Sequence, residues 1–327
     1  MSNRLPLVLI SHALPDDWIK KLEGCCQIAV GPPEANRLST GLMQRLPDAV
    51  GILTLLTIPV TEEMLAKTPH LRVVSNMAVG YDNIDIPACT RRGIPVGNTP
   101  GVLTEGTADM TMALLLAAAR KLPQASQDAR AGRWTTWSPT GWLGADLHGA
   151  TLGIIGMGKI GAAVARRAAA FGMKIIYASP SQKPEVETDL LAMRKSFDEV
   201  LAESDFLSLH CPLTEATRSL IDAATLRAMK PSAILINAAR GPVIVSADLE
   251  HALREKWIAA AALDVTDPEP LPPDHPLYQL PNCLIAPHIG SATQYTRKRM
   301  AELACENLLA GLRQERLPHC INPEVYQ

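Results

Sequence analysis

The stretch at residues 151–161, TLGIIGMGKIG, carries an apolar run that leads into the pattern Gly156-x-Gly158-x-x-Gly161. A helical stretch, residues 162–171, follows it. Glycines at these positions let the backbone approach a pyrophosphate, and the unpaired N–H groups of the helix N-terminus then face the phosphates. The pattern alone also fits a glycine-rich turn without a ligand. A strand before it and a helix after it favour dinucleotide binding.

The glycine pattern lies almost halfway along the 327 residues, so a whole domain's length of chain precedes it. Domains of about 100 to 200 residues are typical, and two are therefore expected here. Turn-forming residues occur near 98–103 and 288–292. We expect a substrate domain formed by residues 1–99 and 289–327, with a dinucleotide-binding domain, residues 100–288, inserted into it. The helix expected at Ala292–Arg313 would then return the chain to the first domain.

Short apolar runs alternate with helical patterns on both sides of the glycine pattern, which is typical of parallel sheets covered by helices. We predict an α/β protein with two doubly wound parallel sheets, a Rossmann domain and a flavodoxin-like one. The expected strands are Leu7–Ile10, Cys26–Val30, Gly51–Leu55, Leu71–Ser75, Lys174–Ala178, Phe206–Leu209, Ala233–Asn237, Ala260–Val265 and Cys283–Ala286. The expected helices before the glycine pattern are Asp16–Leu22, Thr61–Lys67 and Thr104–Leu122, the last with Thr104 as its N-cap.

Composition excludes several classes of function. A net charge of −2 gives no basic field for a polyanion, so nucleic acid is not an expected partner. The longest uninterrupted apolar run, Met112–Ala119, is shorter than the roughly 18 residues that a membrane helix needs. No secretion signal is evident, so we expect a cytoplasmic protein without membrane contact. The seven cysteines follow no metal-binding spacing, and we expect reduced thiols and no metal site.

Polar residues follow three of the expected strands in the second half, in the segments 237–241, 264–270 and 287–291. Because the ligand crevice of such sheets lies at the carboxyl ends of the strands, these residues can converge. The guanidinium of Arg240 suits a carboxylate, and the imidazole of His288 can donate a proton to a keto oxygen. The carboxylate of Glu269 would favour the charged imidazole. Singly, each could be a surface ion pair, a solvated loop residue or a structural histidine.

Six ordered motifs, spread over essentially the whole chain, resemble those of the D-isomer-specific 2-hydroxyacid dehydrogenases. Within that family the chain is most similar to bacterial glyoxylate/hydroxypyruvate reductases, also described as 2-ketogluconate reductases. The motifs are Val79–Asn83, Leu103–Asp109, the glycine pattern, Asn237–Gly241, Asp264–Pro270 and Pro287–Thr293.

The resemblance implies a role for each matching residue. Arg240 binds the substrate carboxylate and keto oxygen, His288 is the acid/base, and Glu269 pairs with His288. The backbone N–H groups of Val79 and Gly80 also bind the carboxylate. The implied cofactor contacts are Thr107, Gly156, Met157, Gly158, Lys159, Ile160, Gly161, Ser179, Lys183, Pro212, Ala238, Asp264 and Gly290.

The cofactor preference is predicted from a residue type that is missing. An NAD enzyme places an acid after the second strand of the nucleotide domain to bind the ribose 2′-hydroxyl. Residues 177–183 read YASPSQK and contain no acid. NADP-dependent reductases of the family also lack the acid but usually carry arginines there, whereas the only cation in this loop is Lys183. We expect NADP(H) to be preferred, with NAD still possible.

The family resemblance also implies a homodimer built around the helix near residues 104–122. The tryptophan-bearing segment 134–142 could bring Trp142 to the partner's active site, or Trp142 could be an ordinary interface anchor. We expect glyoxylate and hydroxypyruvate as substrates. A larger 2-keto acid such as 2-ketogluconate remains an alternative, since loops such as Leu55-Leu56-Thr57 set substrate size. A nucleotide-sensing protein like the corepressors that share this scaffold is a rival from another class.

Overall fold

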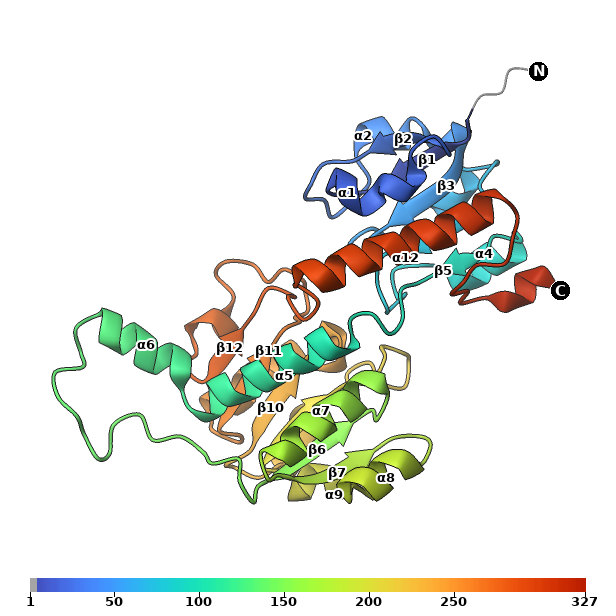
Figure 1. Cartoon of the computed structure of the whole chain (residues 1–327). Helices are drawn as coiled ribbons and strands as arrows, with labels where there is room; N and C mark the ends of the chain where they lie inside the picture. Colours follow the sequence, from blue (N-terminus) through green and yellow to red (C-terminus); the bar gives the residue numbers. More distant parts are fainter. Residues whose placement is uncertain (1–4) are drawn as a thin grey trace. The chain divides into compact units, whose positions relative to one another are not determined.

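The computed structural model describes residues 5–327, which divide into two units (Figure 1). One unit contains the described chain up to Leu103 together with Ala292–Gln327, and the other is Thr104–Ser291. The chain therefore leaves the first unit once and returns to it once. The borders lie a few residues beyond 99 and 288, the positions expected from turn-forming residues.

The first unit is built on a parallel sheet of five strands in the order β2-β1-β3-β4-β5. This is the flavodoxin-like order expected from the alternation of strands and helices. Its strands are β1 (Leu7–Ile10), β2 (Gln27–Val30), β3 (Ala49–Thr54), β4 (Val73–Asn76) and β5 (Val96–Gly97). Its helices are α1 (Asp16–Ile19), α2 (Thr40–Met43), α3 (Glu62–Ala66), α4 (Ile86–Arg91) and α12 (Gln294–Leu312), with 3₁₀ turns at Lys20–Leu22, Leu46–Asp48 and Pro323–Tyr326.

Helix α12 ties the end of the chain to the first unit. The hydroxyl of Ser75, in β4, donates to the carbonyl of Ala304 in α12 over 2.8 Å. The buried side chain of Asn307 donates to the carbonyl of Asn98 and accepts from the N–H of His319, at 2.9 and 3.0 Å. Because buried polar groups are costly unless they are paired, these bonds fix α12 in one position along the sheet.

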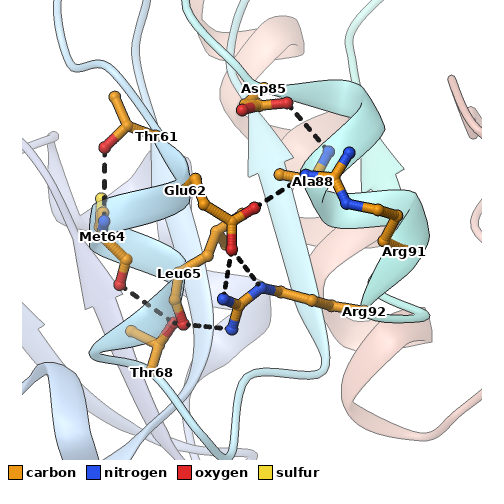
Figure 2. A network of polar contacts seen from close by, with 9 residues as sticks. All are labelled: Thr61, Glu62, Met64, Leu65, Thr68, Asp85, Ala88, Arg91 and Arg92. Carbon is orange, nitrogen blue, oxygen red and sulfur yellow. Dashed lines mark hydrogen bonds and ion pairs between the residues drawn. The ribbon is translucent and has the colours of Figure 1, made fainter.

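A polar network joins α3 to α4 (Figure 2). The carboxylate of Glu62 accepts from Arg91 and from Arg92, with the shortest distance to each guanidinium at 3.0 and 2.5 Å. Arg92 also donates to the carbonyl of Leu65 over 3.0 Å. The side chain of Asp85 caps the N-terminus of α4. An isolated bridge between Val60 and Ile84 joins the residues just before the two helix caps, so the starts of α3 and α4 are tied together.

The second unit is built on a parallel sheet of seven strands in the order β12-β11-β10-β9-β6-β7-β8. Counted within the unit, this is the Rossmann order 3-2-1-4-5-6 with one further strand, so the fold class predicted from sequence is confirmed. Its strands are β6 (Thr151–Ile155), β7 (Lys174–Ala178), β8 (Met193–Arg194), β9 (Phe206–Leu209), β10 (Ile234–Asn237), β11 (Ala260–Leu263) and β12 (Cys283–Ile285). Its helices are α5 (Thr104–Ala119), α6 (Leu122–Arg130), α7 (Lys159–Ala170), α8 (Pro184–Leu190), α9 (Phe197–Glu203), α10 (Ala223–Ala228) and α11 (Ser246–Arg254), with 3₁₀ turns at Gly241–Val243 and Pro276–Gln279.

The helix expected at residues 104–122 is shorter than predicted. Helix α5 ends at Ala119, and Lys121 has a left-handed backbone with φ of 49°. Pro123 lies in the first turn of the next helix, α6, because proline is tolerated in a first turn but breaks a helix interior. Thr104 is the first residue of α5 rather than its cap. The helix expected at Asp16–Leu22 likewise ends early, as α1 and a 3₁₀ turn.

Candidate active site

The glycine pattern forms the turn between β6 and α7, and its glycines are required by the backbone. Gly156 has φ of +96°, a conformation that side chains disfavour. A Cβ at Gly161 would come within 2.4 Å of the carbonyl oxygen of Gly156, so only glycine lets the helix pack this closely on the turn. Gly158 precedes the first residue of α7. This geometry fits a pyrophosphate against the N-terminus of α7.

The turn lies where the strand order of the sheet reverses. Strand β6 pairs with β7 on one side and with β9 on the other. A Cβ at Gly156 would meet the backbone N of Cys211, after β9, at 2.6 Å. Next to it, burial lowers the pKa of His210 to about 4, so its imidazole is neutral at physiological pH. Open sheets bind ligands in the crevice at such a reversal point, and Pro212 follows this segment.

At the end of β10, Asn237 shapes the turn that carries Arg240. Its side chain donates to the carbonyl of Arg240 over 2.9 Å and accepts from the N–H of Ala239 over 3.0 Å. The guanidinium of Arg240 donates to the carbonyl of Ala239 over 2.9 Å. A Cβ at Gly241 would fall 1.9 Å from the carbonyl oxygen of Thr266, so the turn packs directly on the loop after β11. Asn237 was not predicted as a positioning residue, although its side chain forms a recognisable Asx turn.

At the end of β11, Asp264 holds the segment that follows β12. Its buried carboxylate accepts from the N–H groups of Ile289 and Gly290, at 2.8 and 2.7 Å. Its carbonyl accepts from the N–H of His288 over 2.9 Å. Burial raises the pKa of the Asp264 carboxyl, against the opposing effect of these two N–H donors. The carboxylate of Asp264 therefore joins the end of β11 to the segment after β12, and this contact sets the position of His288.

His288 and Glu269 form a hydrogen-bonded pair. The imidazole Nδ1 and the carboxylate Oε1 are 2.5 Å apart, and both side chains remain partly exposed, at 25% and 34%. Because an ionised carboxylate only accepts, Nδ1 is the donor and Nε2 is left for another partner. His288 has φ of 53°, a left-handed value that is uncommon outside glycine and is found at functional sites.

Opposing effects act on the ionisation of Glu269. Burial raises the pKa of its carboxyl, but the hydrogen bond and charge of His288, the N–H of Thr266 and the charge of Arg240 together lower it below its usual range. Glu269 is therefore ionised at neutral pH. An ionised partner favours the protonated form of the imidazole beside it. The Glu269 carboxylate can therefore accept the Nδ1 hydrogen of His288 and orient the imidazole.

Three further residues were expected at the cofactor site: Thr107, Ala238 and Gly290. Thr107 is buried in α5. A Cβ at Gly290 would come within 2.9 Å of the Asp264 carboxylate and 3.4 Å of the Thr107 side chain. Ala238 directly follows β10 and is partly buried. The structure thus brings together Thr107, Asp264 and Gly290.

Val79 and Gly80 belong to the first unit and lie after β4. Their carbonyl oxygens accept from the side chains of Asn98 and Asn76, both at 2.9 Å. Within residues 5–327, no acceptor is found for the N–H groups of Val79 and Gly80. The side chain of Asn83 donates to the carbonyls of Leu55 and Ile58, in the loop expected to affect substrate size. Both loops are therefore ordered within their own unit.

The loop after β7 is contacted by an arginine that its own sequence does not contain. Ser179 directly follows the strand and is partly buried, and the N–H of Lys183 donates to the hydroxyl of Tyr177 over 2.8 Å. Lys183 is the only cation within residues 177–183, but the fold brings a second one to this loop from another strand. Arg194, at the end of β8, donates to the carbonyl of Ser179. Sequence reading missed it because β8 has only two residues and no pattern marks it.

No helix within residues 5–327 combines the length and apolar character needed to cross a membrane. In the same residues, no cluster of three or more histidine, cysteine or acidic side chains is arranged to hold a metal ion. All seven cysteines are free thiols.

Comparison with known proteins identifies the family. Residues 112–290 match the NAD binding domain of the D-isomer specific 2-hydroxyacid dehydrogenases. A glyoxylate reductase of Korarchaeum cryptofilum is 46% identical over 321 residues, covering 98% of this chain and 97% of that protein. A glyoxylate reductase of Aeropyrum pernix is 50% identical over 288 residues, covering 87% and 86%.

Among solved structures, an NADPH-dependent glyoxylate/hydroxypyruvate reductase of Sinorhizobium meliloti, in complex with NADP and malonate, has a TM-score of 0.83. It is 32% identical, and the match covers 97% of this chain and 96% of that chain. A parallel sheet of Rossmann order with a glycine turn at its reversal point is typical of dinucleotide-binding proteins. The chain belongs to the D-isomer specific 2-hydroxyacid dehydrogenase family.

Proposed function

We propose that this protein reduces glyoxylate and hydroxypyruvate to glycolate and D-glycerate. The observation that carries the proposal is the His288 and Glu269 pair, joined at 2.5 Å and positioned by Asp264. The similarity to glyoxylate reductases over nearly the whole length supports the substrate class.

The chemistry assigns one task to each side chain. A reduced nicotinamide supplies the hydride when it is bound. Arg240 binds the carboxylate and the keto oxygen of the substrate, because a planar guanidinium can donate two parallel hydrogen bonds. His288 donates the proton at its Nε2 to the oxygen that becomes a hydroxyl. Glu269 accepts a hydrogen bond from Nδ1 of His288 and so orients the imidazole.

The residues of the second unit fit a dinucleotide. Gly156 and Gly161 shape the turn for a pyrophosphate, with Met157, Lys159 and Ile160 between or beside the glycines. We propose NADP(H) as the preferred form and NAD(H) as a weaker one. An acid after β7 would repel a 2′-phosphate, whereas Ser179 can donate to it and Lys183 adds a positive charge.

A substrate panel tests the proposed function. Oxidation of NADPH is measured with glyoxylate, hydroxypyruvate, pyruvate and 2-ketogluconate, and the acids are ranked by kcat/KM. We expect glyoxylate and hydroxypyruvate to lead. A higher rank for 2-ketogluconate would support the larger-substrate alternative. Binding of NADPH without turnover of any acid would contradict the proposal and favour the nucleotide-sensing rival.

We also propose a cytoplasmic homodimer. Residues 131–140 are exposed throughout, with Trp134 and Trp137 at 64% and 79%, and the segment runs outside the sheet layers of its own unit (Figure 1). Large exposed apolar side chains mark interfaces. The indole of Trp142 donates to Asp128 over 2.7 Å, which anchors the segment to α6. Sedimentation at micromolar concentration measures the assembly state, and a monomer would contradict this proposal.

A further inference from the structure

The loop after β7 receives a guanidinium from the neighbouring strand. Strand β8 pairs with β7 in parallel, with Arg194 opposite Tyr177. Arg194 is exposed, and its side chain reaches along the sheet edge to the loop that follows β7. Its Nε and Nη2 donate to the carbonyl of Ser179 over 3.2 and 3.1 Å, and Nη2 donates to the carbonyl of Pro180 over 3.0 Å.

These bonds orient the backbone of the loop. In a trans peptide the C=O and N–H groups point in opposite directions. Because the carbonyl of Pro180 faces Arg194, the N–H of Ser181 points away from it. Within the described residues 5–327, no acceptor is found for this N–H group. The arginine therefore holds the loop with one donor turned outward.

The charge of Arg194 is not neutralised by an ion pair. No carboxylate of residues 5–327 forms a salt bridge with it. The charge of Arg194 does act on the carboxylate of Glu187. That carboxylate already accepts hydrogen bonds from Tyr177 and Gln182, both at 2.6 Å. The hydrogen bond from Tyr177 is the main cause that lowers the pKa of Glu187, and the charge of Arg194 contributes to it. The hydrogen bonds to Ser179 and Pro180 do not use Nη1.

We propose that Arg194 determines cofactor specificity by binding the 2′-phosphate of NADP(H), together with Ser179 and Lys183. The inference rests on the proposed function, because it assumes that the dinucleotide's ribose lies at the end of β7. A guanidinium already fixed by two carbonyls loses little side-chain freedom when an anion arrives. Arg194 supplies, from the adjacent strand, the charge that the loop itself lacks.

The test measures dissociation constants of NADPH and NADH by nicotinamide fluorescence, which needs no turnover. We expect Arg194→Ala to weaken NADPH binding by about tenfold, as loss of one charge-assisted contact does, and to change NADH binding little. Arg194→Lys keeps the charge but not the paired contacts to the carbonyls. We therefore expect it to weaken NADPH binding less than Arg194→Ala does. Thermal unfolding confirms that each variant is folded.

Lys195→Ala is the matched control. Lys195 is the next residue along the chain and carries the same charge, but it pairs with Glu203. We expect this variant to keep the NADPH preference of the wild type. If Lys195→Ala weakens NADPH binding as much as Arg194→Ala does, the effect comes from net charge alone, and the inference is overturned. Equal weakening of NADPH and NADH in Arg194→Ala would show a structural role alone and also overturn it.

The outcome for the wild type separates this inference from the cofactor proposal. A wild-type protein that binds NADH more tightly contradicts both. A wild-type preference for NADPH that Arg194→Ala retains contradicts only the role of Arg194.

Discussion

At the ends of β10, β11 and β12, the functional segments are held by side chains that lie at the ends of these same strands. Asn237 holds the turn of Arg240, and Asp264 holds the backbone of His288. After β7, the loop is held instead by Arg194, a side chain from another strand. The first region is a set of hydrogen bonds between strand ends, while the second is a largely exposed loop that a side chain from a neighbouring strand helps to hold. Changes in the first region should therefore affect chemistry, and changes in the second should affect cofactor choice.

The largest effect is expected for His288→Asn. Loss of the proton donor removes general acid catalysis, typically worth about 10² to 10⁴ in rate. The dissociation constant of NADPH, measured by fluorescence on the same preparation, should hardly change, because the two regions are separate. A variant with near wild-type kcat would show that another group delivers the proton.

Arg240→Gln should reduce kcat/KM for glyoxylate by about 10² to 10³, as expected when charge-assisted hydrogen bonds to a carboxylate are lost. Both KM and kcat should change, because the substrate and the transition state both present the carboxylate. Initial rates against glyoxylate concentration measure the two constants. Arg240→Lys is the matched control and should recover part of the loss. A change in KM alone would mean that Arg240 binds the substrate without assisting the reaction.

Ser179→Asp should change the second region only. The new carboxylate would repel a 2′-phosphate and accept from ribose hydroxyls, which should shift the ratio of kcat/KM for NADPH and NADH by about tenfold toward NADH. Ser179→Ala tests whether the hydroxyl alone matters. Since Lys183 and Arg194 act partly through exposed charge, the wild-type advantage of NADPH should shrink as salt is raised. A ratio unaffected by the aspartate would place the ribose elsewhere.

Glu269→Gln should have the smallest effect on the maximal rate but should change the pH profile. Glu269 is ionised at neutral pH because its pKa is lowered, and its charge favours the protonated imidazole. Reduction needs that proton, so activity declines at high pH, and removal of the charge should move the decline to lower pH. Rates of keto-acid reduction between pH 5 and 10 measure the shift. An unchanged profile would mean that the pair does not interact during catalysis.

The same contrast explains what sequence could predict. The alternation of apolar runs predicted both parallel sheets, because buried parallel strands are apolar on both faces. Gly156, Arg240, Glu269 and His288 could be proposed because each lies in the short segment that follows a strand recognisable by itself. Arg194 could not, since its role depends on pairing between β7 and a two-residue strand. The break at Lys121 was missed because the apolar helical pattern runs up to Leu122, and only Pro123 signals a new helix.

Transfer of deuterium from NADPH labelled at the reactive C4 position tests the central claim most directly. The protein is incubated with glyoxylate and labelled NADPH in unlabelled water, and the product is analysed by mass spectrometry. Our account predicts one deuterium on the C2 carbon of glycolate for each NADPH oxidised, and none on the hydroxyl, whose proton comes through His288 and exchanges with water. Hydroxypyruvate should give D-glycerate labelled in the same way. Oxidation of NADPH without label at C2, or no oxidation at all, would contradict hydride transfer to the keto carbon.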